Sequence, residues 1–408
     1  MTINNEHNKL NVPNLRFKEF QGEWEKTTIG EIATIKNGPF GSVLHAEDYV
    51  DEGMPIVTTE HFKSGNLPLS KNGIPQVSED DYCRLKGYML ETDDIVFSRV
   101  GSVDINAHVE HVQQGWLFSG RVLRVRPIKS VNSLCLHYVL STESVKRDIR
   151  NRAVGQTMPS INTPILSNTG IYMSQSEAEQ KKIANLLSLI DERISTQNKI
   201  IEDLKKLKSA IIDYAINSFD SGFVKFGSLY EMAGEGGTPT TSNASFYDNG
   251  KIPFIKIDDL KQKYLTENKD FITELGLQKS SAWLVPTHSI LFSNGATIGE
   301  ITITTYPVCT KQGILGIVPK QNIDVEFLYY FMSSSYFKKA VSRIVTEGTM
   351  KTAYLKDINN ILCPIPTKEK QQEIAKMPSA LNSKIDFEQS ILKLFCSQKQ
   401  YLLRQMFI

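Results

Sequence analysis

The chain of 408 residues repeats part of itself about 190 residues later. The segment QKKIA at Gln180–Ala184 recurs as QQEIA at Gln371–Ala375, an offset of 191. More loosely, GQTM at Gly155–Met158 recurs as EGTM at Glu347–Met350, an offset of 192. A period this long lies far above that of solenoid repeats. The repeat predicts a duplicated domain, and we expect the two copies to be related by a pseudo-twofold axis.

Each half begins with a body of short β-type segments and ends in a long helical segment. The expected strands, which should pair as a curved sheet in each half, are Gly30–Ile35, Ile95–Ser98, Val122–Arg126, Glu300–Thr304 and Gly313–Val318. The expected helices run from about Glu177 to Phe219 and from about Lys368 to Phe407, and neither contains glycine. Only the second contains a proline, Pro378, which we expect to kink that helix or delay its start.

Apolar residues recur along both helices with the alternating spacing that is typical of coiled coils. In the first helix this row contains Ile183, Leu187, Ile190, Ile194, Ile201, Leu204 and Ile211, interrupted by Gln197 and Lys208 and ending at Ala215. In the second it contains Ile374, Leu381, Ile385, Leu392, Phe395, Leu402 and Met406, interrupted by Pro378, Glu388 and Lys399. The alternative is two amphipathic helices that each pack on their own domain. About 42 residues would extend roughly 60 Å, longer than one such body can cover, so the pattern favours a coiled coil.

The motifs of several enzyme classes are absent. No Pro-Pro dipeptide is present, which excludes the Asn/Asp-Pro-Pro-aromatic loop that holds the amino group in methyltransferases acting on bases. No window fits a P-loop. The five cysteines form no Cys-x-x-Cys pair, and His108 and His111 have no third metal ligand in view. The sequence therefore predicts a binding protein that is not itself an enzyme and holds no metal.

Basic residues are concentrated although the formal charge of the chain is only +1. Eight of them lie between residues 121 and 152, against two acidic residues: Arg121, Arg124, Arg126, Lys129, Lys146, Arg147, Arg150 and Arg152. The second half has a matching basic turn with Lys338, Lys339 and Arg343. This recurrence suits two surfaces that bind DNA phosphates, although a solvated helix face would give the same pattern. Polar loops follow at 151–162 and 346–354, where the candidate DNA contacts are Gln156, Thr157, Thr349 and Lys351.

No run of 18 apolar residues and no signal peptide is apparent, so we expect a cytoplasmic protein without a membrane span.

The order of these features resembles the specificity subunit of type I restriction-modification systems. The resemblance covers the whole chain and includes the N-terminal VPNLRF at Val12–Phe17 and FQGEW at Phe20–Trp24. It implies an α+β fold with target recognition domains at 1–172 and 221–366. It also implies two helices, at 173–220 and 367–408, that form an antiparallel coiled coil.

In that family the chain recognises a bipartite DNA target and has no catalytic role. Its helices dock two methyltransferase subunits that methylate adenine N6, and motor-nuclease subunits add restriction. S-adenosylmethionine, ATP and Mg²⁺ are then expected on the partners, with no cofactor on this chain. Residues that read bases cannot be transferred, because recognition domains diverge with their targets. Two alternatives remain, a coiled-coil scaffold with two peptide- or glycan-binding domains and an enzyme with an unrecognised site.

Overall fold

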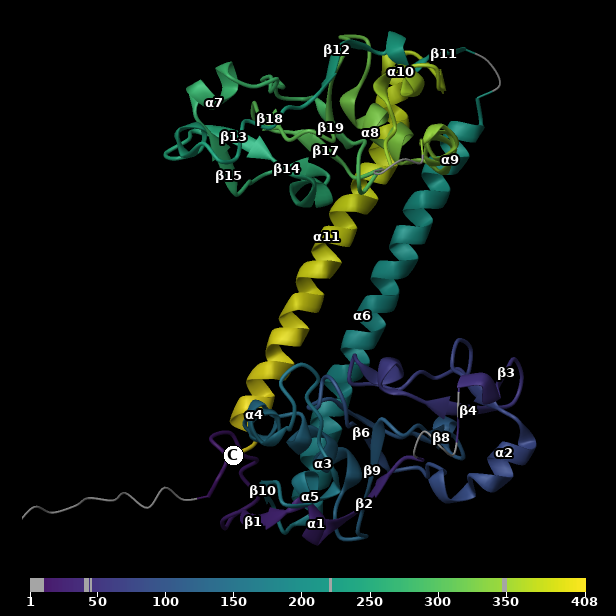
Figure 1. The fold of residues 1–408 in the computed structure, drawn as a ribbon, viewed down its shortest axis with the longest axis vertical. Helices are drawn as coiled ribbons and strands as arrows, with labels where there is room; N and C mark the ends of the chain where they lie inside the picture. Colours follow the sequence, from purple (N-terminus) through teal and green to yellow (C-terminus); the bar gives the residue numbers. More distant parts are fainter. Residues whose placement is uncertain (1–10, 40–43, 45, 220–221, 347–350) are drawn as a thin grey trace, which may run out of the picture. The chain divides into compact units, whose positions relative to one another are not determined.

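The computed structural model describes residues 11–39, 44, 46–219, 222–346 and 351–408 (Figure 1). The chain divides into two compact units. Unit 1 contains the residues up to Thr196 together with Leu392–Ile408, and unit 2 contains Gln197–Ile391. Two long helices, α6 (Glu177–Asn217) and α11 (Lys368–Gln405), each contribute one part to unit 1 and the other part to unit 2.

Unit 1 contains three small sheets. An antiparallel sheet has the order β2 (Ala33–Asn37), β9 (Val122–Pro127), β6 (Ile95–Ser98) and β7 (Asn106–His108). A mixed sheet has the order β3 (Tyr49–Val50), β5 (Gln76–Val77), β4 (Met54–Val57) and β8 (Leu117–Phe118). The antiparallel pair β1 (Glu25–Thr28) and β10 (Gly170–Met173) forms the third. The shorter helices are α1 (Ile29–Ile32), α2 (Glu79–Arg84), α3 (Ser133–Leu140), α4 (Glu143–Arg152) and α5 (Thr163–Ser167).

Unit 2 repeats this plan. Its main sheet has the order β12 (Tyr230–Glu235), β19 (Ile314–Pro319), β16 (Ile290–Ser293), β17 (Ile301–Thr304) and β14 (Tyr264–Leu265). The second sheet has the order β15 (Asp270–Ile272), β13 (Ile252–Ile255) and β18 (Cys309–Thr310), and the third pairs β11 (Phe223–Lys225) with β20 (Leu362–Pro364). The shorter helices are α7 (Glu274–Gln278), α8 (Val325–Ser333), α9 (Ser335–Ile344) and α10 (Leu355–Ile358).

The strand registers show that the two units are copies of one fold. β6 pairs with β9 so that Ile95 is opposite Val125, and β16 pairs with β19 so that Ile290 is opposite Ile317. In both units one face of this sheet packs on two consecutive helices, α3 and α4 or α8 and α9, and on part of a long helix. The chain is thus an α+β protein that contains two copies of a sheet-rich body.

Most of the expected strands are confirmed, but Gly30–Ile35 is partly wrong. The chain forms the helical turn α1 before β2 begins at Ala33. A capping box explains the difference, because Thr28 donates its backbone N–H to the Glu31 carboxylate at 2.7 Å. This interaction satisfies an amide that would otherwise lack an intrahelical partner.

Both long helices are confirmed. α6 starts at the expected residue, and α11 starts at Lys368 and continues through Pro378. The delayed start that Pro378 suggested is therefore wrong. Pro378 is buried and lies at the row position of an apolar residue, so its ring contributes packing although it cannot donate a backbone hydrogen bond.

The repeated glutamine has the same structural role in both copies. Gln180 accepts a hydrogen bond at 2.7 Å from the backbone N–H of Asn132, the N-cap residue of α3, and donates one at 2.8 Å to the carbonyl of Ser174. Gln371 accepts at 2.8 Å from the backbone N–H of Asp324, the N-cap residue of α8, and donates at 2.9 Å to Pro366. Each buried amide therefore fixes the start of a long helix to its own body.

We expect Gln371→Ala to lower the free energy of unfolding of unit 2 by about 1–3 kcal/mol, because it leaves the backbone N–H of Asp324 and the carbonyl of Pro366, both on half-buried residues, without their partner. Gln372→Ala is the matched control, since the side chain of Gln372 is exposed on the same turn. Urea unfolding followed by circular dichroism measures both. Equal midpoints for the two variants would contradict this structural role.

Burial of His137 on α3 predicts a pH-dependent stability. The side chain is 6% exposed, its Nδ1 lies 2.7 Å from Oδ1 of Asn106, and burial lowers its pKa to about 3. His108, whose pKa burial also lowers, and Tyr138 border the ring. In the unfolded chain His137 takes up a proton below about pH 6.5, whereas in the folded chain it stays neutral.

Stability should therefore fall as the pH drops below 6.5, by up to about 1.4 kcal/mol per pH unit for this one group. His137→Gln should reduce that slope between pH 6.5 and 5, which urea titrations at several pH values measure. An unchanged slope in the variant would contradict a neutral buried imidazole.

Candidate nucleic-acid interface and helix seam

A polar cleft of about 600 Å³ opens in unit 1. It lies between the end of β4, the end of β6 and the turn from β8 to β9, and its polar lining includes Tyr49, Thr58, Thr59, Glu60, Arg99, Ser119 and Arg121. Backbone hydrogen bonds hold these segments together. Arg99 donates its N–H to the carbonyl of Arg121 at 3.0 Å, and Ser119 donates to Val57 at 2.8 Å. Hydrogen bonds therefore hold in place the backbone that carries the polar side chains of the cleft.

A tight turn borders the same cleft. Val154 and Ser160 exchange two backbone hydrogen bonds of 2.9 Å, and Ile161 donates to the carbonyl of Arg99 at 2.9 Å. Gly155 has a φ of +103°, and a Cβ there would lie 2.8 Å from the carbonyl of Met158, so the turn requires glycine. Gln156 and Thr157 are exposed on this turn, beside the residues that line the cleft.

Unit 2 has the same backbone scaffold with different side chains. Asn294, at the position of Arg99, donates its N–H to Gly313 at 3.0 Å and accepts from Ala353 at 2.8 Å. Lys311, at the position of Ser119, donates to Ile255 at 2.9 Å. The two units thus hold equivalent positions with matching hydrogen bonds, while the functional groups at those positions differ. Thr349 lies outside the described residues.

Three of the predicted basic residues are engaged in ion pairs within unit 1. Arg126 pairs with Asp94 and Glu91 at 2.6 Å each, and the hydrogen bond that it donates to Asp94 raises the pKa of Arg126. Arg150 pairs with Asp104 at 2.5 Å and with Glu143. Arg152 pairs with Asp148 at 3.0 Å. Arg124 is half-buried in β9, where burial lowers its pKa.

Of the remaining predicted basic residues, Lys129 is exposed in the turn after β9, and the others lie on α4, on α9 or beyond it, and beside the cleft. Lys146 is half-buried and Arg147 exposed, and both line a hollow of about 640 Å³. α9 carries three exposed basic residues, Lys338, Lys339 and Arg343. Two more are exposed elsewhere, Lys351 beyond α9 and Arg121 at the cleft. The structure also adds two arginines that the sequence reasoning missed, Arg99 in the cleft and Arg404 beside Lys146 and Arg147. Neither belongs to a basic run, so only the fold could associate them with the others.

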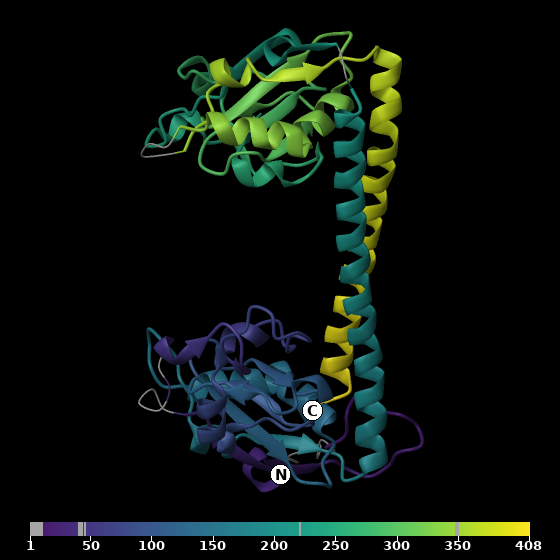
Figure 2. The same cartoon turned by 90° about the vertical axis from the view of Figure 1, so that its right-hand side faces the viewer.

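The two predicted apolar rows face each other in the seam between α6 and α11, where every row member is buried or half-buried. In each unit the two helices run side by side (Figure 2). In unit 2, Gln197 donates to the backbone carbonyl of Glu388 at 3.1 Å and to its carboxylate, and Lys208 donates to Asn382 at 2.9 Å. In unit 1, Lys399 pairs with Asp191 at 2.5 Å. The residue order shows that the helices are antiparallel within each unit.

These polar contacts follow the repeat. Lys208 and Lys399 are equivalent at the offset of 191, and so are Asp191 and Asn382. The Lys208–Asn382 contact in unit 2 is therefore the counterpart of the Lys399–Asp191 pair in unit 1. Each polar interruption of the two rows thus has a polar partner across the seam.

Large apolar residues also remain exposed on the outer faces of both helices. On α6 they are Leu189, Ile200, Leu207 and Tyr214, and on α11 they are Met377, Phe387, Leu394 and Tyr401. Residues 200, 207 and 214 follow one another at a spacing of seven, as do 387, 394 and 401. The sequence reasoning missed these residues because it searched for the row that closes the seam.

Among the described residues, no group of three or more His, Cys, Asp or Glu side chains could hold a metal ion. Within the same residues, none of the helices is long and apolar enough to cross a membrane.

Comparisons with known proteins identify relatives of both units. The model of a family described as "Type I restriction modification DNA specificity domain" matches twice, over residues 21–206 and 220–394. A putative type I restriction enzyme MjaX specificity subunit of Methanocaldococcus jannaschii is 26% identical over 405 residues, covering 91% of this chain and 89% of the relative. The EcoR124I/EcoR124II specificity subunit of Escherichia coli is 27% identical over 168 residues, covering 39% of this chain and 41% of the relative.

Solved structures share the fold. The S subunit of a type I restriction-modification system from M. genitalium has a TM-score of 0.58 at 18% identity, covering 97% of this chain and 99% of that one. A chain from a structure described as the basis of complex assembly and conformational transition of the type I R-M system has a TM-score of 0.57 at 14% identity, with coverages of 93% and 96%. At these identities the likeness concerns the fold alone.

Proposed function

Because the chain belongs to the family of type I restriction-modification DNA specificity proteins, we propose that it reads a bipartite DNA target, one half with each unit. The specificity role is that of the family, and it is not a catalytic role. The division of labour between the units rests on one observation: matching backbone hydrogen bonds hold different side chains at equivalent positions. Two readers built on one scaffold would recognise different half-sites in this way.

In unit 1 the proposed base-reading surface is the cleft with Arg99 and Arg121 and the adjoining turn with Gln156 and Thr157. Arginine guanidinium groups and amide or hydroxyl side chains are the groups that recognise base edges. The proposed phosphate contacts are Lys146 and Arg147 in unit 1 and Lys338, Lys339 and Arg343 in unit 2. Arg126, Arg150 and Arg152 have a supporting role, because their ion pairs connect separate segments or turns of unit 1.

The chain acts in a complex with other subunits of its system. We further propose that these are two methyltransferase subunits, which methylate adenine N6, and motor-nuclease subunits. S-adenosylmethionine, ATP and Mg²⁺ would then be bound by those partners. The exposed apolar residues on the outer faces of α6 and α11 support a docking role for the helices. A partner that covered residues such as Leu207 and Leu394 would remove apolar surface from water, which is favourable.

Salt dependence tests the phosphate contacts. We expect Lys146→Ala to weaken binding to all DNA sequences and to lower the slope of log affinity against log salt by about one unit, because one fewer phosphate is neutralised. Arg126→Ala is the control. It should destabilise unit 1 but leave that slope unchanged, since Arg126 is paired with Asp94 and Glu91. Fluorescence anisotropy of a labelled duplex at several salt concentrations measures both variants.

A changed target preference with an unchanged slope in Lys146→Ala would mean that this residue reads bases. A chain that bound no DNA at low salt, even in complex with its methyltransferase partner, would favour the peptide- or glycan-binding scaffold.

Exchanging the first body tests the proposed modularity. Residues up to about Asn168 would be replaced by those of a relative and the hybrid co-expressed with its methyltransferase partner. We expect one half of the methylated target to change and the other half to remain, because each unit has its own hydrophobic core and its own copy of the hydrogen-bonded backbone scaffold. Mapping of methylated adenines in the host DNA provides the readout. Changes in both halves would contradict independent reading.

A further inference from the structure

The hollow of about 640 Å³ in unit 1 lies between the start of α4 and the last turns of α11. Three cationic side chains line it, Lys146 and Arg147 from α4 and Arg404 from α11. Glu143 lines it too, but its carboxylate is paired with Arg150. In the described part of the chain, none of the three cations forms an ion pair. The hollow therefore carries positive charge that no ion pair among these residues balances.

The first turn of α4 also lacks a side-chain cap. Its N-cap residue, Thr142, donates its hydroxyl to the carbonyl of Val139 at 2.7 Å and accepts no hydrogen bond from an amide of α4. The backbone N–H groups at a helix start have no intrahelical acceptor and carry partial positive charge. The hollow thus combines amide donors with three cations, and both kinds of group bind oxyanions.

Unit 2 holds a carboxylate of its own at the equivalent place. Asp213 on α6 corresponds to Arg404 at the offset of 191, and α9 is the copy of α4. Asp213 accepts a hydrogen bond at 2.7 Å from the backbone N–H of Ser335, the first residue of α9. Ser334, the N-cap residue, accepts another at 3.2 Å from the backbone N–H of Phe337. The start of α9 therefore already binds an anionic group, whereas unit 1 has an arginine in place of that carboxylate.

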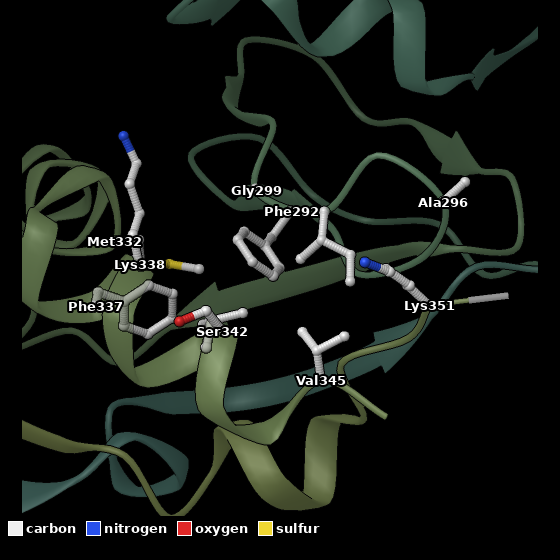
Figure 3. A pocket seen from close by; sticks show the side chains of 11 residues that line it. Phe292, Ala296, Gly299, Met332, Phe337, Lys338, Ser342, Val345 and Lys351 are labelled. Atoms are coloured by element: carbon white, nitrogen blue, oxygen red, sulfur yellow. The ribbon is translucent and has the colours of Figure 1, made fainter. Parts of the chain in front are cut away.

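The two short helices pack on their bodies in the same way. Phe337 of α9 packs on Phe292 of β16 with ring centroids 6.0 Å apart, and its counterpart Val145 is buried in the core of unit 1. In Figure 3 the side chain of Lys338 extends away from Phe292. Lys338 corresponds to Lys146 at the offset of 192. The units therefore differ at this place in the side chain that the long helix supplies.

From this difference we propose that the hollow of unit 1 binds a phosphate group of the DNA backbone, and we call it the oxyanion site. Arg404, Lys146 and Arg147 would hold the phosphate together with the first amides of α4. Guanidinium groups bind phosphate oxygens with two parallel hydrogen bonds, which suits Arg404 and Arg147. The proposal rests on the proposed function and extends it, because it adds a residue of the long helix and makes the site specific to unit 1.

Inorganic phosphate probes the oxyanion site without DNA. Thermal unfolding of the full chain is compared in sodium phosphate and in sodium chloride at equal ionic strength. We expect phosphate to raise the midpoint by about 2–4 °C and Arg404→Gln to lose most of that rise. Lys393→Gln is the matched control, because Lys393 is exposed on the same helix and does not line the hollow. An equal rise in all three chains would be a general salt effect and would overturn the site.

Anisotropy of a labelled duplex tests whether the anion is DNA. Arg404→Gln should lower the slope of log affinity against log salt by about one unit, and Lys393→Gln should leave it unchanged. A phosphate effect that depends on Arg404 together with an unchanged DNA slope would overturn the assignment to DNA. Failure of the parent chain to bind any duplex, even with its methyltransferase partner, would instead contradict the proposed function.

A double variant gives unit 1 the residues of unit 2. Glu143→Ser with Arg404→Asp places a serine and a carboxylate where unit 2 has Ser335 and Asp213. We expect this variant to fold, which circular dichroism checks, and to lose the rise in midpoint with phosphate, because its own carboxylate occupies the amides of α4. A folded double variant that responds to phosphate as the parent chain does would show that the anion binds elsewhere.

Discussion

The structure depends on the hydrogen bonds that join each long helix to its own body. The first turn of every helix, including those of α3 and α8, contains backbone amides without intrahelical partners. Gln180 and Gln371 use one buried side chain to satisfy a backbone N–H there and a carbonyl on the preceding segment. Because the amide is rigid and buried, it fixes where the helix leaves the body. The apolar residues that follow, such as Ile183 in unit 1 and Ala375 in unit 2, then pack into the core of that body.

The seam uses polar residues to select one register. An uninterrupted apolar row would allow α6 to slide along α11 by one turn at little cost. Such a shift would separate Gln197 from Glu388 and Lys208 from Asn382, leaving groups with low exposure unpaired, at about 1–3 kcal/mol for each hydrogen bond lost. Hydrogen bonds from Lys384 and Gln197 also lower the pKa of Glu388, so this carboxylate stays ionised in the seam. A polar residue at a row position is a known way of fixing register in coiled coils.

The sequence allowed good predictions where local patterns carried the information. The long helices follow from a periodicity that is sustained despite a few polar interruptions, and strands such as β6 and β19 follow from short apolar runs between turns. The candidate site was harder because charge density does not distinguish an exposed lysine from an arginine held by a distant carboxylate. Arg126 is paired with Asp94, 32 positions earlier in the chain, while Arg99 has no basic neighbour in the sequence and reaches the cleft only through folding. The start of α11 was misjudged because packing stabilises the helix on both sides of Pro378, where Ala375 and Ile385 are buried.

Duplication gives this fold a particular freedom. The backbone hydrogen bonds around Arg99 and Asn294 are equivalent, so they do not depend on which side chain each position carries. The side chains add contacts of their own, because Arg99 donates to the carbonyl of Gly120 at 3.1 Å and the buried Asn294 donates to that of Ala353 at 3.3 Å. The Arg150–Asp104 ion pair of unit 1 shows the same freedom, because Ser342 and Gly299 stand at the equivalent positions of unit 2, yet the strands keep their register. The two bodies can therefore diverge in what they bind while the buried glutamines and the polar seam contacts keep the scaffold unchanged.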